Sequence, residues 1–439
     1  MLERMFGIKA QGSSVRTEVL AGATTFMTMA YIVLVNPLIL SQAGMPVAGV
    51  AAATCLAAGF GSILMGFIAN YPIALAPGMG LNAYFTFTVV KGMGVPWETA
   101  LGCVLISGLV FLALTLAGVR KVIVEAVPRA LFAAIAAGIG LFIAFIGLKG
   151  AGLVVANPAT TVALGDLKAP MTLLALGGLA LTGVLMAWRV RAAVLLGVLG
   201  VTGAAFFLHL SPFEPGAYDL AALSTTAFKA DVSAALGLGP GGLSAAILEI
   251  VFVFLFVDFF DNLGTLVAVT KRAGLQGPDG SIPRLNRILL ADSIATIAGA
   301  TAGTSTVVSY IESATGVAAG GRTGLTAIVT GILFLITLFA APYVQMIPAA
   351  ATAPALILVG GMMMAPLAET DWADPGVAIP SFLTLTIIPL TFSIANGLAF
   401  GIVSYAALKV LKSGPKLGDW ALYLLAGLFI ARFAWTAAG

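Results

Sequence analysis

Charged side chains are scarce in this sequence. It has 21 basic and 18 acidic residues among 439, so only 9% of the chain is charged. About a quarter of the residues are charged in a typical soluble domain, so this chain cannot cover a large surface in water. The net charge of +3 is also too small to indicate a nucleic-acid partner. We therefore expect the lipid bilayer to surround most of the protein.

Cysteine and histidine are nearly absent. The two cysteines, Cys55 and Cys103, both lie within apolar runs, which argues against a disulfide framework. The single histidine, His209, ends an apolar run and is interpreted as a residue of the membrane interface. A metal site of the usual kind would need more of these ligands. We expect neither a metal nor a cofactor.

Apolar runs long enough to cross a bilayer recur along the whole chain. Hydrophobic residues make up 60% of the sequence, and about 20 consecutive apolar residues suffice for a transmembrane helix. The charged opening segment, Met1–Glu18, does not look like a cleavable signal peptide. A last apolar segment, Trp420–Trp435, is either a span or an interfacial helix. About fourteen main spans are predicted, at 17–41, 47–69, 73–90, 97–117, 129–148, 170–188, 191–209, 242–270, 286–301, 304–319, 322–340, 347–366, 378–394 and 395–411.

Lysine and arginine gather in the loops on one side of this arrangement. They precede the first span and follow the fourth, sixth, eighth and fourteenth spans, and such loops face the cytoplasm. The longest loop, 210–241, has three acidic residues against one lysine and is predicted to lie outside. This places the N-terminus in the cytoplasm and the chain in a plasma membrane, the inner membrane of a bacterium.

The two halves of the chain carry a related segment. Val124–Ala133 and Val344–Ala353 share a valine, a proline and two alanines in register, and Gly140 then aligns with Gly360. Each half holds seven predicted spans, and because seven is odd the second half must be inverted relative to the first. Inverted repeats are common in secondary transporters, whose binding sites lie near the midplane where the repeats meet.

Two predicted spans contain helix-breaking segments at matching places. In the third span, Leu75–Asn82 includes Pro77, which removes a backbone donor, and two glycines. In the tenth span, Gly303–Ser313 includes the run Thr304–Val308, whose β-branched residues favour extended backbone. We expect a half-strand followed by a half-helix in each repeat, with the N–H groups of each half-helix facing a substrate. Two ordinary kinked packing helices are the alternative.

Three carboxyl groups fall deep in apolar sequence. Asp258 and Asp261 lie three residues apart on one face of the eighth span, and Glu312 lies in the interrupted tenth span. A charge at such a depth is costly, so these acids are functional candidates. Burial disfavours the ionised form, so one of them could exchange a proton. The alternative is a structural acid bonded to backbone or hydroxyl groups.

Other polar residues of the apolar runs could line the same cavity. Thr25, beside Thr24 in the first span, is one candidate, although threonine hydroxyls in membrane helices usually bond to their own backbone. Asn36, which precedes a proline, is another. Asp292 and the serine after it, in the ninth span, are interpreted as packing residues.

Four segments together resemble one transporter family. They are Gly22–Ile32, Ala76–Phe85, Asp258–Thr265 and Ser309–Gly324. In this order they are similar to the adenine/guanine/hypoxanthine permeases, the AzgA-like branch of the nucleobase–ascorbate transporter superfamily. The resemblance covers nearly the whole chain.

This resemblance implies an all-α polytopic membrane protein with two inverted seven-helix repeats, in which short strands break helices 3 and 10. It implies proton-coupled uptake of purine bases by an elevator-type movement, and homodimers occur in the superfamily. A core domain would comprise helices 1–4 and 8–11, and a gate domain helices 5–7 and 12–14. The corresponding residues are 1–117 and 242–341 for the core, 118–209 and 342–417 for the gate, 210–241 for the outer loop, and 418–439 for a C-terminal apolar segment.

The resemblance also implies roles for single residues. Asp261 and Glu312 would hold the base, and one of these two or Asp258 would carry the proton. The rest of the pocket would come from the first span and the two interruptions, at Thr25, Met79, Gly80, Asn82, Tyr310, Ile311 and Ser313. The pair Thr24–Thr25 departs from the Gln-His of uracil and xanthine carriers, which favours the purine branch. Asn262 differs from the threonine associated with that branch.

Two other classes of function remain as alternatives. An anion transporter or channel of the same inverted-repeat fold would need a cationic side chain at the tenth-span break, whereas the nearest one, Arg322, lies at the far end of that span. A membrane-embedded enzyme would need a nucleophile with a base, or a metal, and neither histidine nor cysteine lies near the acids. The preferred purine, and proton against sodium as the coupling ion, stay open.

Overall fold

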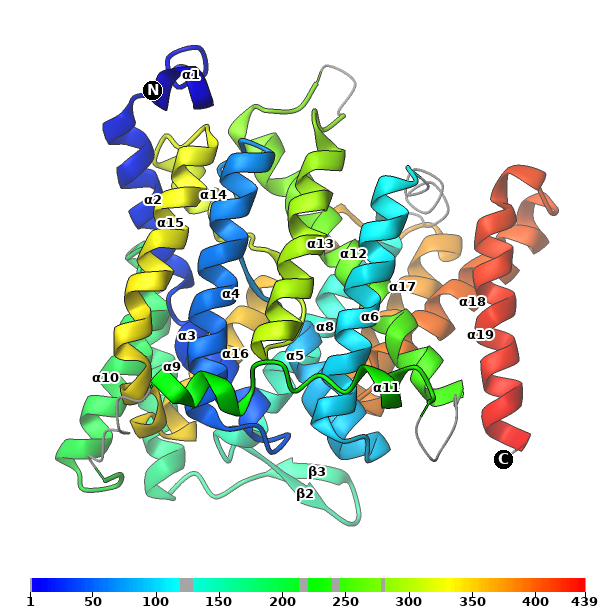
Figure 1. The fold of residues 1–439 in the computed structure, drawn as a ribbon. Helices are drawn as coiled ribbons and strands as arrows, with labels where there is room; N and C mark the ends of the chain where they lie inside the picture. Colours follow the sequence, from blue (N-terminus) through cyan, green and yellow to red (C-terminus); the bar gives the residue numbers. More distant parts are fainter. Residues whose placement is uncertain (1, 119–128, 213–219, 239–244, 278–280, 439) are drawn as a thin grey trace. The chain divides into compact units, whose positions relative to one another are not determined.

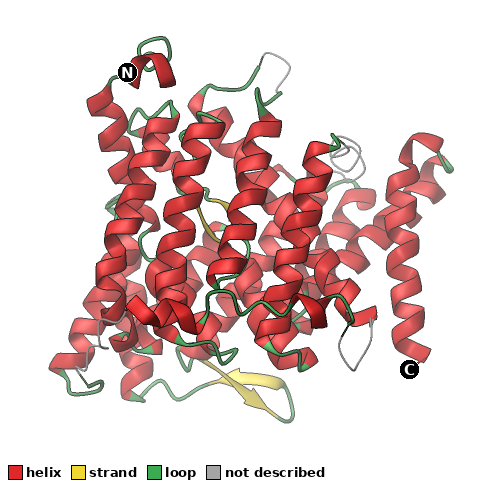
Figure 2. Ribbon diagram, in the orientation of Figure 1, coloured by secondary structure: helices red, strands yellow, loops and turns green. Residues whose placement is uncertain are grey.

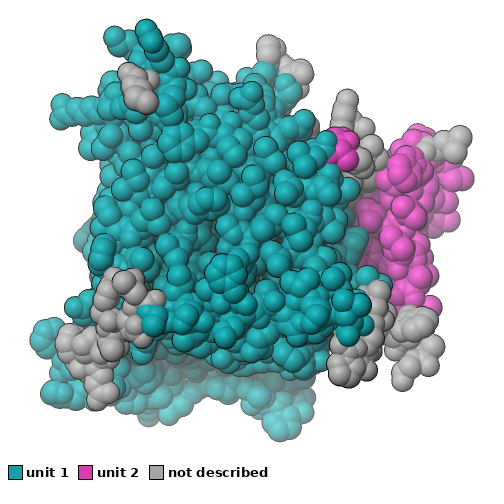
Figure 3. Space-filling view, viewed as in Figure 1, with its two compact units in different colours: residues 1–116, 147–355 teal, residues 117–146, 356–439 magenta. Residues whose placement is uncertain are grey.

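The structure is a computed structural model that describes residues 2–118, 129–212, 220–238, 245–277 and 281–438. The chain forms two compact units, which are described separately below (Figure 3). Unit 1 comprises residues 1–116 and 147–355, and unit 2 comprises residues 117–146 and 356–439.

Nearly all regular structure in the described residues is helical (Figures 1 and 2). Within these residues, nine helical stretches are long and apolar enough to cross a membrane, and three apolar helices are shorter. The first predicted span is two helices, α2 and α3, with a break at residues 30–31, and each of the other predicted spans coincides with a helix or with a strand followed by a helix. The number of crossings stays a prediction. In unit 1 the helices are α1 (Leu2–Phe6), α2 (Val15–Met29), α3 (Ile32–Ser41), α4 (Val47–Ile68), α5 (Met79–Ala83), α6 (Trp97–Leu116), α9 (Pro170–Ala187), α10 (Ala193–Phe207), α11 (Val232–Ala235), α12 (Ala245–Ala273), α13 (Leu285–Ala302), α14 (Ser313–Ala318) and α15 (Gly324–Thr337).

A short strand lies at each of the two predicted interruptions. β1 (Leu75–Pro77) precedes α5, which continues into a π-helical segment, Tyr84–Gly92. β4 (Val307–Ser309) precedes α14. The two strands pair antiparallel, with Ala76 opposite Val308, and all their residues are buried. Two segments far apart in the sequence thus meet inside unit 1.

Further backbone hydrogen bonds extend this pairing beyond the strands. The N–H of Gly78 donates to the carbonyl of Thr306 at 2.9 Å, and the N–H of Tyr310 donates to the carbonyl of Ala74 at 3.0 Å. In a membrane, non-helical backbone must find partners inside the protein. The crossing strands satisfy this requirement with each other.

A second antiparallel pair, β2 (Val154–Asn157) and β3 (Thr161–Leu164), was not predicted from the sequence. It forms an exposed hairpin on the opposite side of unit 1 from α1 (Figure 1). The side chain of Asn157 accepts hydrogen bonds from the N–H groups of Ala159 and Thr160, at 2.8 and 3.1 Å, which stabilises the turn.

Close helix contacts in unit 1 depend on glycine. A Cβ atom added to Gly66 of α4 would lie 2.5 Å from the carbonyl oxygen of Gly324 in α15, and one added to Gly331 would lie 2.6 Å from that of Gly59. Small residues let membrane helices approach in this way. Helix α13 packs between α4 and α6, and it also contacts β4.

Unit 2 is built from α17 (Pro375–Thr391), α18 (Ile394–Ser413) and α19 (Trp420–Ala438), with parts of α8 (Arg129–Gly150) and α16 (Ala349–Met362). Gly140 and Gly360, which align in the sequence repeat, pack against each other: a Cβ added to Gly140 would lie 2.5 Å from the Gly360 carbonyl oxygen. The first half of the repeat segment, residues 124–128, lies outside the described residues. The last apolar segment is a helix, and whether it crosses the membrane stays a prediction.

Candidate substrate-binding site

Two predicted acids meet beside the crossing strands. Asp261 lies on the long helix α12 and is half-buried, and Glu312 immediately precedes α14 with 9% of its surface exposed. The two carboxyl groups lie close enough for their charges to interact. Helices α12 and α14 also contact each other directly. The sequence prediction that both acids share one neighbourhood therefore agrees with this geometry.

Tyr31 completes this cluster, and sequence reasoning missed it. It lies at the break between α2 and α3, is 1% exposed, and donates a hydrogen bond from its phenol to Oε1 of Glu312 at 2.7 Å. A buried tyrosine hydroxyl usually has such a partner. Tyr31 stands in the middle of an apolar span, where its hydroxyl needs such a partner. This need was the signal in the sequence that could have identified it.

Tyr310 lies next to both acids and close to Tyr31. Its phenol donates to the carbonyl of Pro77 at 2.5 Å, and its backbone N–H is bonded across the strand crossing. Hydrogen bonds therefore hold Tyr310 both at its backbone and at its hydroxyl. Two carboxyl groups and two phenols converge from α12, the α2–α3 break and the β4–α14 segment.

The rest of the second interruption is divided between an exposed and a buried part. Ile311 is 41% exposed, whereas Ser313 is fully buried. The Ser313 hydroxyl accepts a hydrogen bond from the N–H of Ala74 at 3.0 Å, and its own N–H bonds to the Tyr310 carbonyl at 3.1 Å. Ser313 thus supports the crossing, while Ile311 has surface available for a ligand.

In the first interruption, Asn82 is bonded within the protein. Its amide donates to Oδ1 of Asn36 at 2.6 Å, and its carbonyl oxygen accepts from the hydroxyl of Ser305. Asn36 in turn donates to the hydroxyls of Thr54 and Thr304 at 2.7 and 3.0 Å. This buried network joins the two interruptions, so a role of Asn82 in binding would be indirect. Met79 and Gly80 are buried in the first turn of α5.

The threonine pair of the first span faces two different neighbours. Thr24 donates to the Leu20 carbonyl at 2.8 Å and accepts from the guanidinium of Arg191 at 3.1 Å. Thr25 is fully buried, and its hydroxyl has no hydrogen-bond partner among the described residues. It packs against Gly316, on the helix that follows Glu312.

Asp258 and Asp292 are both buried, at 2% and 0% exposure. Asp258 precedes Asp261 by about one helical turn in a segment rich in phenylalanine. Asp292 was interpreted as a packing residue, and it accepts a hydrogen bond from the amide of Asn262, the residue after Asp261. The carbonyl oxygen of Asn262 accepts from the backbone N–H of Ser309 at 2.9 Å. Both Asn262 and Asp292 therefore connect to the strand crossing.

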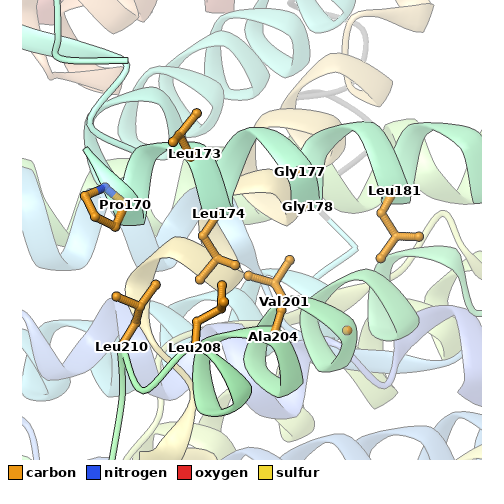
Figure 4. A pocket seen from close by; sticks show the side chains of 11 residues that line it. Pro170, Leu173, Leu174, Gly177, Gly178, Leu181, Val201, Ala204, Leu208 and Leu210 are labelled. Atoms are coloured by element: carbon orange, nitrogen blue, oxygen red, sulfur yellow. The ribbon is translucent and has the colours of Figure 1, made fainter. Parts of the chain in front are cut away.

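A separate apolar pocket lies between α9 and α10 (Figure 4). Its volume is about 480 Å³, and only apolar residues and glycines line it. They are Pro170, Leu173, Leu174, Gly177, Gly178, Leu181, Gly200, Val201, Ala204, Leu208 and Leu210. None of the predicted site residues belongs to this pocket, so it does not supply the polar contacts expected of the binding site.

Comparison with known proteins decides the family. Residues 16–400 match the model of a permease family. The chain belongs to this family. It is 48% identical over 437 residues to a putative permease of Methanocaldococcus jannaschii, covering 99% of both chains. It is 45% identical to the guanine/hypoxanthine permease PbuG of Bacillus subtilis (strain 168), over 98% of this chain and 99% of that one. It is 43% identical to the adenine permease AdeP of Escherichia coli (strain K12), over 93% and 91%.

Solved structures show the same fold at low sequence identity. The transmembrane domain of a cyanobacterial bicarbonate transporter, BicA, aligns with a TM-score of 0.59 and 18% identity over 91% of this permease and 97% of that chain. The structure of SLC26A9 aligns with a TM-score of 0.64 and 10% identity over 91% and 66%. This permease is therefore a multi-pass membrane transporter of that fold, and the resemblance to the nucleobase–ascorbate transporter superfamily is confirmed.

Proposed function

We propose that this permease transports purine nucleobases and binds them between Asp261 and Glu312. The observation that carries the proposal is that both acids lie beside the strand crossing, because α12 contacts α14 and the residue after Asp261 is bonded to Ser309 of β4. Relatives that are 43–45% identical are named as adenine and guanine/hypoxanthine permeases, which supports the same substrate class. Asp261, Glu312 and the exposed side chain of Ile311 would contact the base.

The chemistry of a purine fits this arrangement. A purine is planar and presents ring N–H groups and, in adenine and guanine, an exocyclic amine, all of which donate hydrogen bonds. Tyr31 occupies Oε1 of Glu312, so the second oxygen of this carboxylate and the carboxylate of Asp261 are the acceptors assigned to the base. A ligand that lacks matching donors would leave these acceptors unpaired in a dry site, and this costs about 1–3 kcal/mol for each group.

The same two acids are the proposed carriers of the coupling proton, with Asp258 as a third candidate. Burial makes two neighbouring carboxylates costly when both are ionised, so protonation of one would accompany binding. Transport would follow an elevator-type alternating access of core against gate. The core and gate ranges, the coupling ion, a homodimer and a cytoplasmic N-terminus remain parts of this proposal.

The described groups around the site argue against an anion substrate. Asp261, Tyr31 and Tyr310 are ionisable side chains that interact with Glu312. None of these is cationic. Arg322 instead donates to the carbonyls at the end of α14, at Val317 and Gly321.

Uptake of labelled hypoxanthine, guanine and adenine into proteoliposomes, with and without an inward acid gradient, tests the proposal. Asp261→Asn and Glu312→Gln are each expected to abolish uptake, because an amide places a donor where the base needs an acceptor. Asp371→Asn, the same exchange at an exposed loop residue, is the control and should transport like the wild type. Normal uptake by both site variants would remove the site, and uptake indifferent to the gradient would remove the proton coupling.

A further inference from the structure

Side chains of two helices hold the backbone of β4. Asn262 of α12 accepts from the N–H of Ser309 at 2.9 Å. Thr296 of α13 donates to the carbonyl of Val307 at 2.9 Å and accepts from its N–H at 3.2 Å. Asn262 and Thr296 are fully buried, and Ser309 is 2% exposed. The strand is therefore fixed by α12 and α13 in addition to its pairing with β1.

The hydrogen bond between Asn262 and Ser309 joins two segments at the residues next to the site. On α12, Asn262 directly follows Asp261. On the other segment, Ser309 is directly followed by Tyr310, and Glu312 comes two residues later. One bond thus sets the spacing between Asp261 and the segment that carries the other acid.

Asp292 of α13 determines which way the Asn262 amide points. The nitrogen of Asn262 donates to Oδ2 of Asp292, and both side chains are fully buried. A primary amide has one acceptor oxygen and one donor nitrogen. Because the carboxylate binds the nitrogen, the oxygen faces the N–H of Ser309. The reversed amide would set its donor against that N–H.

We propose that Asn262 and Asp292 are a positioning pair for the substrate site. Asp292 orients Asn262, and Asn262 fixes the register of Asp261 against the segment from Tyr310 to Glu312. Neither member of the pair contacts the base. The inference rests on the proposed function, and it assigns a role to an acid that packing alone does not explain, because an apolar residue would fill the same space at lower cost.

Single substitutions measure the effect on binding. Asn262→Leu removes both hydrogen bonds and leaves the Ser309 N–H without its acceptor, so the KM for purine uptake should rise about tenfold. Asp292→Ala should also raise KM, but by less than Asn262→Leu does. The maximal rate should change less than KM. Ser293→Ala is the matched control, because the Ser293 hydroxyl donates to the Leu289 carbonyl of its own helix at 2.7 Å and lies 3.4 Å from the Thr115 hydroxyl of α6. Rates are taken per folded molecule, counted by size-exclusion chromatography.

A double-mutant cycle separates positioning from a general structural role. If Asp292 acts only through Asn262, the variant with both Asn262→Leu and Asp292→Ala should have the KM of Asn262→Leu alone, within about twofold. An independent structural contribution of Asp292 would instead add to the loss.

A second experiment exchanges the two residues. It tests the positioning pair even if Asn262→Leu does not fold. Asn262→Asp with Asp292→Asn keeps one carboxylate and one amide, and the relocated carboxylate can accept from both the Ser309 N–H and the amide. This exchange should bring KM back toward the wild-type value, whereas Asn262→Asp alone should not.

Three results would overturn the positioning pair: a wild-type KM in Asn262→Leu, additive losses in the cycle, or an exchange variant no better than Asn262→Asp. Absence of purine uptake by the wild-type chain would instead overturn the proposed function, and this inference with it.

Discussion

Replacement of Glu18 by alanine tests how strongly α2 is tied to the start of α15. Glu18 lies in the first turn of α2 and is fully buried. Its carboxylate accepts hydrogen bonds from the backbone N–H groups of Arg322 and Thr323, at 2.9 and 3.2 Å, and from the hydroxyl of Thr326 at 2.6 Å. The N–H groups before and within the first turn of a helix have no partner inside that helix. Glu18, on α2, supplies the acceptor for the N–H groups of Arg322 and Thr323 at the start of α15.

The size of the effect follows from these bonds. Glu18→Ala leaves two backbone donors without an acceptor, and each buried unsatisfied donor costs about 1–3 kcal/mol, so we expect a loss of about 2–6 kcal/mol. The Thr326 hydroxyl is not counted, because it lies 3.3 Å from the carbonyl oxygen of Glu18, which alanine retains. A loss of about 4 kcal/mol should lower the unfolding midpoint by about 4–8 °C in a chain of this length.

Thermal unfolding in detergent, followed by loss of the monodisperse chromatography peak, gives the midpoint. Asp166→Ala is the control, because the Asp166 side chain also accepts a backbone N–H, that of Lys168 at 2.8 Å, but does so in an exposed turn. Its midpoint should stay unchanged. Glu18→Gln should fall between the wild type and Glu18→Ala, since it keeps one acceptor oxygen. A Glu18→Ala midpoint equal to that of Asp166→Ala would refute the assignment of stability to these bonds.

Two further substitutions test contacts of the site. Tyr31→Phe removes the donor to Glu312. A hydrogen bond to a charged group is worth about 1.5–3 kcal/mol, so the KM for purine uptake should rise by about tenfold or more. An unchanged KM would exclude Tyr31 from the site. Gly316→Ala places a Cβ 2.7 Å from the carbonyl oxygen of Ala21 and close to the Thr25 hydroxyl, so the thermal midpoint should fall. Thr25→Ala should not rescue this variant, because the Ala21 contact is with backbone; rescue would contradict that reason.

The positions of the spans, the interruptions and the acids could be predicted from the sequence because lipid imposes simple rules on each of them. A spanning helix needs a long apolar run, and a carboxyl group in such a run needs a reason to be there. Pro77 and the run Thr304–Val308 break helix locally, and the structure has β1 and β4 beside them. That cost singled out Asp258, Asp261 and Glu312, and the family resemblance then gave the binding roles to Asp261 and Glu312.

The partners of the polar residues could not be predicted, because a pairing is a property of three-dimensional packing. Asn82 was placed in the pocket, yet its side chain bonds to Asn36 and Ser305. Tyr31 looked like one more apolar residue of the first span. Glu18 was counted within the charged opening segment, although it is fully buried. The hairpin β2–β3 has no buried face that would produce a clear alternating pattern.

The way in which polar groups are satisfied separates scaffold from site in this permease. Asn36 and Asn82 bond to each other and to hydroxyls of neighbouring segments, so they hold the crossing strands together. Glu312 is bonded through one oxygen to Tyr31, and Asp261 is only half-buried. Since an ionised group in a membrane must be compensated, an acid whose bonding is incomplete or whose surface is accessible is the one that a substrate can complete. By this criterion the crossing strands provide rigidity, and Asp261 and Glu312 are the acids that we propose to recognise a ligand rich in hydrogen-bond donors.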